Sequence, residues 1–165
     1  MVVLGIDPGT ATLGWGIIKK PANQEYKVEA YGCIETDRAT IFSERLKEIY
    51  KRLKKIIQTY HPDTAAIEQL FFAKNVKTAT SVGEARGVAI LAAVEANLAI
   101  AEYTPLQVKQ SLVGYGRAEK KQMQKMVKIL LGLEDIPKPD DAADALAVAL
   151  CHLNSERMGK LIRHD

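Results

Sequence analysis

Two short apolar segments, each ending at a single acidic residue, constrain the fold of this chain most. Residues 2–6 form the first segment, which leads into Asp7 and a Pro-Gly turn. Residues 64–67 form the second segment, which ends at Glu68. Short apolar runs bounded by turn residues are typical of buried strands. The sequence therefore predicts two core strands, each with a carboxylate at its carboxyl end.

The rest of the chain predicts helices and further strands. From about 40 to 60, apolar residues recur at spacings of three and four, which is typical of an amphipathic helix. We expect further strands at 15–18, 26–34 and 100–103, and further helices at 76–97, from 105, at 118–131 and at 140–154. The helix at 76–97 is rich in Ala and contains Gly83 and Gly87, so we expect it to be buried and closely approached by a neighbour. Strands that come first and then alternate with helices predict an α/β fold, with a mixed sheet flanked by helices on both faces.

Composition sets broad limits on the class of protein. The 165 residues suit one domain spanning 1–165, and an excess of 23 basic over 20 acidic residues permits a nucleic-acid partner without indicating one. Cys33 and Cys151 lie far apart in apolar stretches, so we expect buried thiols in a reducing, cytoplasmic compartment. The apolar run at 88–94 is far shorter than the roughly 20 residues that a membrane span needs, and we expect no membrane insertion.

Acidic residues also begin the helix expected at 140–154. Asp141 and Asp144 lie three residues apart and share a helix face, but Asp140 and Asp144, four apart, share one as well. Spacing alone leaves both pairs open. Asp140 follows a proline, and we interpret it as an acid that caps the helix.

The four acids together predict a metal site. Alone, Asp7 could be an ordinary turn former, and Glu68 could form an ion pair with a Lys or Arg. Converging carboxylates, however, repel one another unless cations bind, and oxygen-only ligands suit Mg²⁺ or Mn²⁺. Two such ions can activate water and stabilise the leaving oxygen of a phosphodiester. The set therefore predicts metal-assisted hydrolysis that leaves a 5′-phosphate and a 3′-hydroxyl.

Five motifs resemble, in order and spacing, those of the RuvC family of Holliday junction resolvases. They are Leu4-Gly-Ile-Asp-Pro-Gly-Thr, Ala66-Ile-Glu-Gln, Ala85-Arg-Gly-Val-Ala, Gln107-Val-Lys-Gln and Asp141-Ala-Ala-Asp-Ala-Leu-Ala. The resemblance covers nearly the whole chain and implies a ribonuclease-H-like fold with a five-stranded mixed sheet. It also implies a set of catalytic and metal-binding acids, which excludes Asp140: Asp7, Glu68, Asp141 and Asp144. Some members carry His at the last of these positions, whereas this chain keeps an aspartate.

The resemblance further implies the activity and the partners. The expected enzyme is an Mg²⁺-dependent endonuclease that resolves four-way DNA junctions by symmetric nicks in two opposed strands, in homologous recombination and DNA repair. Mn²⁺ is the expected substitute metal, with two ions in each subunit. Symmetric cuts need two sites related by a two-fold axis, so we expect a homodimer, for which the helix at 76–97 is a candidate interface. Branch-migration helicases are expected partners, and the expected location is the cytoplasm, at the nucleoid.

Basic and aromatic residues are expected to contact the DNA. By resemblance, Phe71 matches an aromatic residue that stacks on a base at the junction centre, whereas we expect Phe72 in the core.

Lys109 and Lys120 match basic positions near the active site. Other basic residues occur after Glu68 and before the last helix, where phosphates would run, although a surface lysine is often merely solvated. They are Lys74, Lys77, Arg117 and Lys121, with Lys125 as a further candidate. We interpret Arg86 as structural and assign no role to His61, His152 or His164.

Three other functions remain open. The Asp-Pro-Gly-Thr turn also resembles the phosphate loop of actin and sugar-kinase ATPases, but those enzymes close two such domains over a nucleotide and this chain has room for one. A junction-binding module without cleavage would present the same binding surface, although the complete set of acids disfavours it. An RNA-directed nuclease of the same fold is the third possibility.

Overall fold

The structure, a computed structural model, describes residues 1–22, 24–70 and 76–162, with the side chains of 76–78 and 157–162 left outside the description. The strands in these ranges are β1 (Val2–Asp7), β2 (Thr12–Lys19), β3 (Lys27–Glu35), β4 (Thr64–Glu68) and β5 (Ala99–Tyr103). The helices are α1 (Phe42–Tyr60), α2 (Val76–Glu95), α3 (Pro105–Val113), α4 (Lys120–Leu130) and α5 (Asp140–Ile162). The expected α/β fold is confirmed.

The strands form one mixed sheet in the order β3-β2-β1-β4-β5. β1 pairs antiparallel with β2 and parallel with β4, while β2 pairs antiparallel with β3 and β4 parallel with β5. Because β1 and β4 run in the same direction, their carboxyl ends meet at one edge of the sheet. This edge is where ligand sites gather in open α/β sheets.

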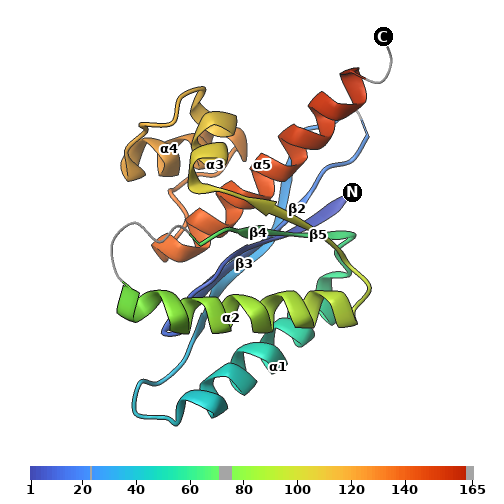
Figure 1. Cartoon of the computed structure of the whole chain (residues 1–165). Coiled ribbons are helices and arrows are strands. Elements are labelled where there is room, and N and C mark those ends of the chain that lie inside the picture. Colours follow the sequence, from blue (N-terminus) through green and yellow to red (C-terminus); the bar gives the residue numbers. More distant parts are fainter. Residues whose placement is uncertain (23, 71–75, 163–165) are drawn as a thin grey trace.

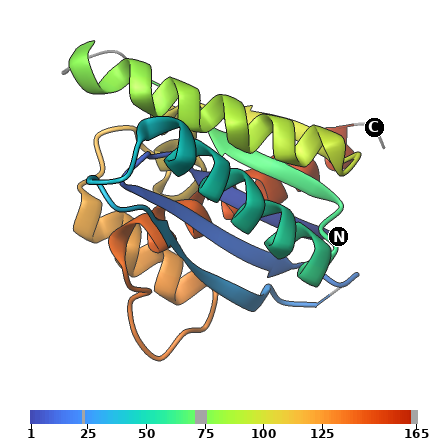
Figure 2. The same ribbon diagram turned by 90° about the horizontal axis from the view of Figure 1, so that it is seen from below.

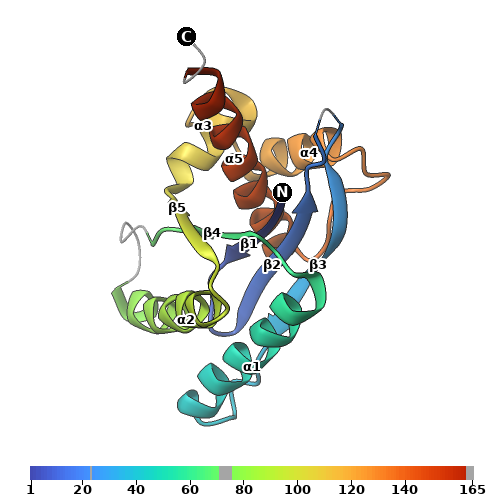
Figure 3. The same cartoon turned by 90° about the vertical axis from the view of Figure 1, so that its right-hand side faces the viewer.

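Helices cover both faces of the sheet. α1 and α2 pack against each other on one face, whereas α3, α4 and α5 lie on the other (Figure 1). The view from below shows α1 and α2 running across their face (Figure 2), and the side view separates the two helical layers (Figure 3). Each layer encloses its own group of buried apolar side chains against the sheet.

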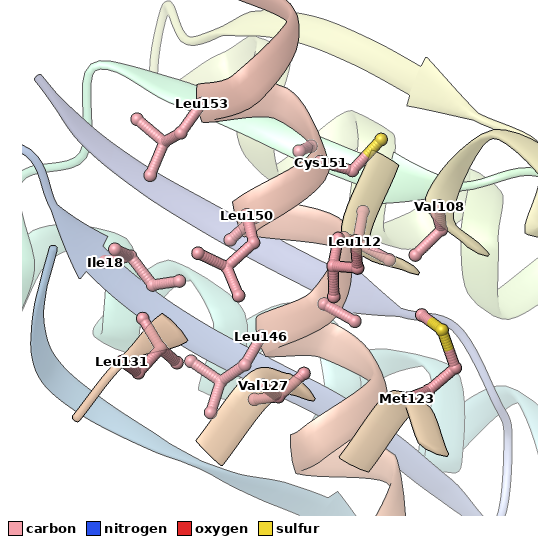
Figure 4. Close-up of a cluster of buried hydrophobic side chains, with 14 of the residues drawn as sticks. Ile18, Val108, Leu112, Met123, Val127, Leu131, Leu146, Leu150, Cys151 and Leu153 are labelled. Carbon is pink, nitrogen blue, oxygen red and sulfur yellow. The ribbon is translucent and has the colours of Figure 1, made fainter. Parts of the chain in front are cut away.

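The core on the α5 face holds that helix in place. Leu146 and Leu150 of α5 are fully buried and lie near Ile18 of β2, with Val127 of α4 and Leu112 of α3 on the helical side (Figure 4). Burying a side chain of this size contributes about 1.5–3 kcal/mol. The core therefore fixes the position of α5 relative to the sheet.

The expectation that α2 is a buried helix closely approached at its glycines needs correction. Ala85 and Ala89 are buried, but Leu91 and Val94 are each 52% exposed. A Cβ built at Gly83 would lie 3.4 Å from Cδ1 of Leu70, which is an ordinary contact, and no heavy atom of the described residues outside the helix's own backbone lies within 4 Å of a Cβ built at Gly87. The sequence pattern failed because Ala and Gly are compatible with both a buried and an exposed helix face.

Two smaller expectations also change. α5 continues past the expected end near 154 to Ile162, because the segment beyond 154 contains Glu, Arg, Met and Lys, which are good helix formers, and no Pro. Cys151 is buried as expected, whereas Cys33 is only partly buried because it lies on the edge strand β3.

Within the described ranges, no helix is long and apolar enough to cross a membrane.

Candidate active site

Two acids end neighbouring parallel strands. Asp7 is the last residue of β1 and Glu68 the last residue of β4. The strands pair in register up to Ile6 and Ile67, so the two acids emerge next to each other at the carboxyl edge of the sheet. Their side chains are hydrogen-bonded to each other. Two carboxyl groups can share such a bond only when one of them holds a proton, so they titrate as a coupled pair.

Helix α5 brings two more acids, Asp141 and Asp144, to this edge. It can approach closely because glycines lie on the strands beneath it. A Cβ at Gly14 would lie 1.9 Å from the carbonyl oxygen of Asp141, and a Cβ at Gly5 would lie 2.1 Å from another backbone oxygen of α5. Gly14 pairs with Asp7 across β1 and β2. The missing side chain at Gly14 therefore lets Asp141 lie beside Asp7.

Burial and mutual repulsion raise the pKa of Asp7 well above its ordinary value. The main cause is burial, which penalises the charged form, followed by the negative charges of the other three acids. The hydrogen bond to Glu68 acts in the same direction. The proton of the shared hydrogen bond therefore belongs to the Asp7–Glu68 pair, whose pKa values are both raised.

The pKa values of Glu68 and Asp144 are raised as well. Burial is the first cause for Glu68 and the charge of Asp144 the second, while the hydrogen bond to Asp7 and the charge of Lys109 oppose them. Burial also raises the pKa of Asp144, against the pull of Lys120. These acids resist ionisation in the absence of a cation, and a bound cation would relieve their repulsion.

Lys120 bridges two acids at the start of α5. Its Nζ lies 3.2 Å from an oxygen of Asp144 and 3.2 Å from an oxygen of Asp140. Burial disfavours the charge of Lys120, but attraction to the two carboxylates outweighs it and raises the pKa of this lysine. Asp140 also accepts a hydrogen bond of 2.9 Å from Gln124. The residue that we interpreted as a helix cap thus directs its carboxylate toward α4, and the pKa of Asp140 is lowered by these two partners.

A pocket of about 210 Å³ opens between the acids and the lysines. Lys109 and Lys120 line it together with Glu68 and Asp144, as expected for basic residues near the active site. Its remaining lining residues are Pro105, Val108, Met123 and Ala147. The pocket therefore places two cations next to carboxylates that could hold a metal.

The chemistry of the donor set fits a hard divalent cation. All four acids offer oxygen ligands only, which suits Mg²⁺ or Mn²⁺. In the part of the chain that the structure describes, no three His, Cys, Asp or Glu side chains are already arranged around a metal position. Lys120 instead neutralises Asp144. Metal binding would draw the carboxylates closer together and would compete with the bond between Lys120 and Asp144.

A hydrogen-bonded group supports the chain just beyond Glu68. The backbone N–H of Gln69 donates to the carbonyl of Tyr103 at 2.8 Å, and its side-chain amide donates to Glu102 at 3.3 Å. Arg86 of α2 pairs with the same Glu102 at 2.5 Å. These contacts agree with a structural role for Arg86, which ties α2 to the edge of the sheet that carries Glu68.

The other expected DNA contacts are placed only in part. Arg117 and Lys121 are exposed. Lys125 lines a separate cavity of about 700 Å³ with Lys128 and Lys138. The rest lie outside the described residues: Phe71, Lys74 and the side chain of Lys77. Phe72, which we expect in the core, lies outside them as well.

Sequence reasoning missed two features of this region. The first is the glycine surface under α5, although Gly5 and Asp7, like Gly14 and Gly16, are two residues apart and so share a strand face. The second is a groove of about 520 Å³ that borders Asp141 and lies near the turn between β1 and β2. Its basic residues come from a loop and from α1, and no pattern in the sequence links them to the acids.

Comparison with known proteins agrees with this arrangement. Residues 3–152 match the family model described as crossover junction endodeoxyribonuclease RuvC. The crossover junction endodeoxyribonuclease RuvC of Ruminiclostridium cellulolyticum is 56% identical over 165 residues, which cover 100% of this chain and 99% of that protein. The Thermus thermophilus RuvC structure matches with a TM-score of 0.89 and 37% identity, over 96% of this chain and 97% of that one. T. thermophilus RuvC in complex with Holliday junction substrate matches with a TM-score of 0.88 and 34% identity, over the same shares of 96% and 97%.

The fold is therefore the ribonuclease-H-like fold found in resolvases. The chain belongs to the RuvC family of crossover junction endodeoxyribonucleases.

Proposed function

We propose that this chain is a metal-dependent endonuclease that resolves four-way DNA junctions by paired nicks in two opposed strands. The observation that carries the proposal is the convergence of acids from β1, β4 and α5 in a chain of the RuvC family. Cleavage of a phosphodiester needs groups that neutralise charge on both sides of the reacting phosphorus. The acid cluster and the adjoining lysines are arranged to supply them.

The acids have proposed roles in this reaction. Asp7, Glu68, Asp141 and Asp144 would hold Mg²⁺, or Mn²⁺ as a substitute, with two ions in each subunit. When bound, these ions supply activation of water and stabilisation of the leaving oxygen. The proton shared by Asp7 and Glu68 would leave on metal binding, because the ligand form of each acid is the carboxylate.

The two lysines have separate proposed roles. Lys109 lines the pocket beside Glu68 and is placed to neutralise an oxygen of the scissile phosphate. Lys120 would exchange part of its attraction to Asp144 for the phosphate when DNA enters. Both lysines would therefore act on the substrate from the α3 and α4 side of the acids.

We also propose that the enzyme is a homodimer that uses α2 as its interface. Leu91 and Val94 are each 52% exposed, and Gly87, Leu91 and Val94 follow one another at helical spacing on one face. Such an apolar stripe on a surface helix favours contact with another chain. Sedimentation should give a dimer at micromolar concentration, and Leu91→Glu should shift it toward monomer. A wild-type protein that stays monomeric would contradict this part of the proposal.

A cleavage assay tests the proposed function. A synthetic four-way junction and a linear duplex of the same sequence are incubated with Mg²⁺ or with EDTA. We expect metal-dependent paired nicks on the junction only, lost in Asp7→Asn and retained in Asp135→Asn, which makes the same chemical change at an exposed residue outside the acid cluster. Junction binding without any cleavage by the wild type would favour a binding module. Preferential cleavage of structured RNA would overturn the choice of substrate.

Delivery of the junction by branch-migration helicases, and a location at the nucleoid, stay predictions. Co-sedimentation of the purified chain with such helicases on junction DNA would test the first. Imaging of a fluorescent fusion would test the second.

A further inference from the structure

A second groove borders the acids on the side away from Lys109 and Lys120. It has a volume of about 520 Å³, and its lining includes Asp141, Thr10 of the turn after β1, Thr12 at the start of β2, and two arginines, Arg38 and Arg45. We propose that this groove binds a backbone phosphate of the DNA strand that passes through the active site. The inference rests on the proposed function, since it assumes that a DNA strand enters the site.

Arg45 is held in position by the turn that follows Asp7. Its Nε donates to the hydroxyl of Thr36 at 2.8 Å, and that hydroxyl donates to the carbonyl oxygen of Thr10 at 2.5 Å. Thr36 is only 8% exposed, and its backbone N–H donates to the carbonyl of Ala11 at 3.0 Å. The guanidinium group is thus anchored at one nitrogen beside the turn that follows Asp7. Anchoring reduces the entropy lost when the group binds a ligand.

The charged residues that line this groove have a net positive charge, from two arginines and one aspartate. Among the ion pairs of the described residues, neither Arg38 nor Arg45 takes part. Two arginines therefore face one acid, Asp141, whose charge a metal would neutralise. The planar guanidinium group binds phosphate oxygens through two N–H groups at once, and threonine hydroxyls are common partners of DNA phosphates. The chemistry of the lining matches a phosphodiester anion.

The position of the groove matches the path of a strand. A DNA strand whose scissile phosphate lies at the acids must continue in both directions away from them. Lys109 and Lys120 line the pocket next to Glu68 and Asp144, whereas the arginine groove begins at Asp141 and is formed by other elements. The groove therefore offers a cationic site for a phosphate on the opposite side of the cut.

The salt dependence of junction binding tests this proposal. Binding is measured in EDTA from about 50 to 200 mM KCl for the wild type, Arg45→Gln, Arg38→Gln and Lys55→Gln. Lys55 is an exposed lysine on the same helix as Arg45, in no ion pair of the described residues and outside the groove, so it controls for the loss of one charge. Each lost phosphate contact should reduce the slope of log K against log salt by about 0.9. We expect that change, with about tenfold weaker binding, for Arg45→Gln, and little change for Lys55→Gln.

Uncharged phosphate analogues in the DNA locate the phosphate that Arg45 contacts. Junctions are made that carry an uncharged methylphosphonate at one position at a time. At one position beside the cleavage site, this change should weaken junction binding by the wild type but should not weaken binding by Arg45→Gln any further. Thr36→Val removes the anchor but keeps the guanidinium charge, so it should lower the cleavage rate without changing the salt slope.

Two results overturn the proposal in different ways. If the wild type cuts the junction but Arg38→Gln, Arg45→Gln and Lys55→Gln keep the wild-type salt slope, the groove does not bind phosphate, and Arg45 only supports the turn. If the wild type neither prefers nor cuts the junction, the proposed function fails and the groove proposal fails with it.

Discussion

The two ends of α5 place opposite kinds of residue against the same sheet. At the amino-terminal end, Asp141 and Asp144 join other acids in a partly buried cluster whose charges repel. Farther along, Leu146 and Leu150 are fully buried, and the buried His152 is hydrogen-bonded. One helix therefore carries groups that oppose folding and groups that stabilise it. Apolar burial at one end of α5 thus holds the repelling carboxylates in place at the other end.

Removing core contact from the apolar end should give the largest loss of stability. Leu150 is fully buried among side chains of α5, β2 and α3. Leu150→Ala should lower the free energy of unfolding by about 2–5 kcal/mol, through lost burial and a cavity. Urea unfolding in EDTA measures this loss. At a temperature where the variant is folded, junction cleavage should stay close to the wild-type rate. A large loss of rate would show that packing at the apolar end of α5 also determines the activity of the acids at its other end.

Glycine substitutions on β2 compare the two ends directly. A Cβ at Gly14 meets the backbone of Asp141 at 1.9 Å, whereas a Cβ at Gly16 meets the side chain of Leu146 at 2.6 Å. Both Gly14→Ala and Gly16→Ala should lower the free energy of unfolding by about 1–3 kcal/mol through overpacking. Only Gly14→Ala moves the acids, so cleavage should fall about a hundredfold more in that variant. Equal loss of activity in the two variants would contradict this account of how α5 is positioned.

Neutralising one acid should stabilise the metal-free protein. The pKa of Asp7 is raised in the folded state, so the ionised carboxylate destabilises folding once the pH exceeds its unfolded value of 3.8. Asp7→Asn should therefore raise the melting temperature in EDTA at neutral pH, by roughly 2–4 °C for each 1 kcal/mol of relieved repulsion. The difference should vanish in acid, where Asp7 is protonated in both states. Calorimetry across this pH range measures it, and a lower melting temperature for Asp7→Asn at neutral pH would contradict the repulsion.

Acidification should destabilise the protein through His152, at the apolar end of α5, and this is the smallest of the predicted effects. His152 is buried against Tyr103, with 2.8 Å between the tyrosine hydroxyl and Nδ1, and burial lowers its pKa. The stability that His152 contributes is complete above the unfolded value of 6.5 and is lost as the pH falls toward the lowered pKa.

The sign of this effect is opposite to that of the acids, and Glu68 and Asp144 still titrate when Asp7 is replaced. A comparison of two variants that both lack Asp7 therefore isolates the contribution of His152. Asp7→Asn should lose more stability between about pH 7.5 and 5.5 than Asp7→Asn combined with His152→Gln. Parallel curves for the two variants would mean that His152 does not titrate as its burial requires.

The sequence predicted the parts of the site that depend on local pattern. Asp7 and Glu68 were expected at strand ends because an apolar run followed by an acid is a local signal. The choice between Asp140 and Asp141 was not available from spacing and came from the family resemblance. In the structure Asp140 contacts Lys120 and Gln124, and Asp141 raises the pKa of Asp7. The choice of Asp141 over Asp140 stays a prediction.

Features that depend on tertiary contacts could not be predicted. The importance of Gly14 follows from the register of β1 and β2 together with the depth at which α5 packs. The arginine groove joins Arg38, from the loop after β3, to Arg45 of α1 at the turn after β1, and segments so far apart in sequence leave no local pattern. The side of α2 that is exposed was likewise undetermined, because alanine and glycine fit either environment.

Anomalous diffraction from crystals soaked in Mn²⁺ would show whether α5 brings its acids to the ends of β1 and β4 to hold a catalytic metal. We predict an anomalous peak bonded to Asp7 and to Glu68 or Asp144, with Lys120 withdrawn from Asp144, and no such peak in Asp7→Asn. A peak elsewhere at saturating Mn²⁺, in a crystal of active enzyme, would contradict this arrangement of the acids.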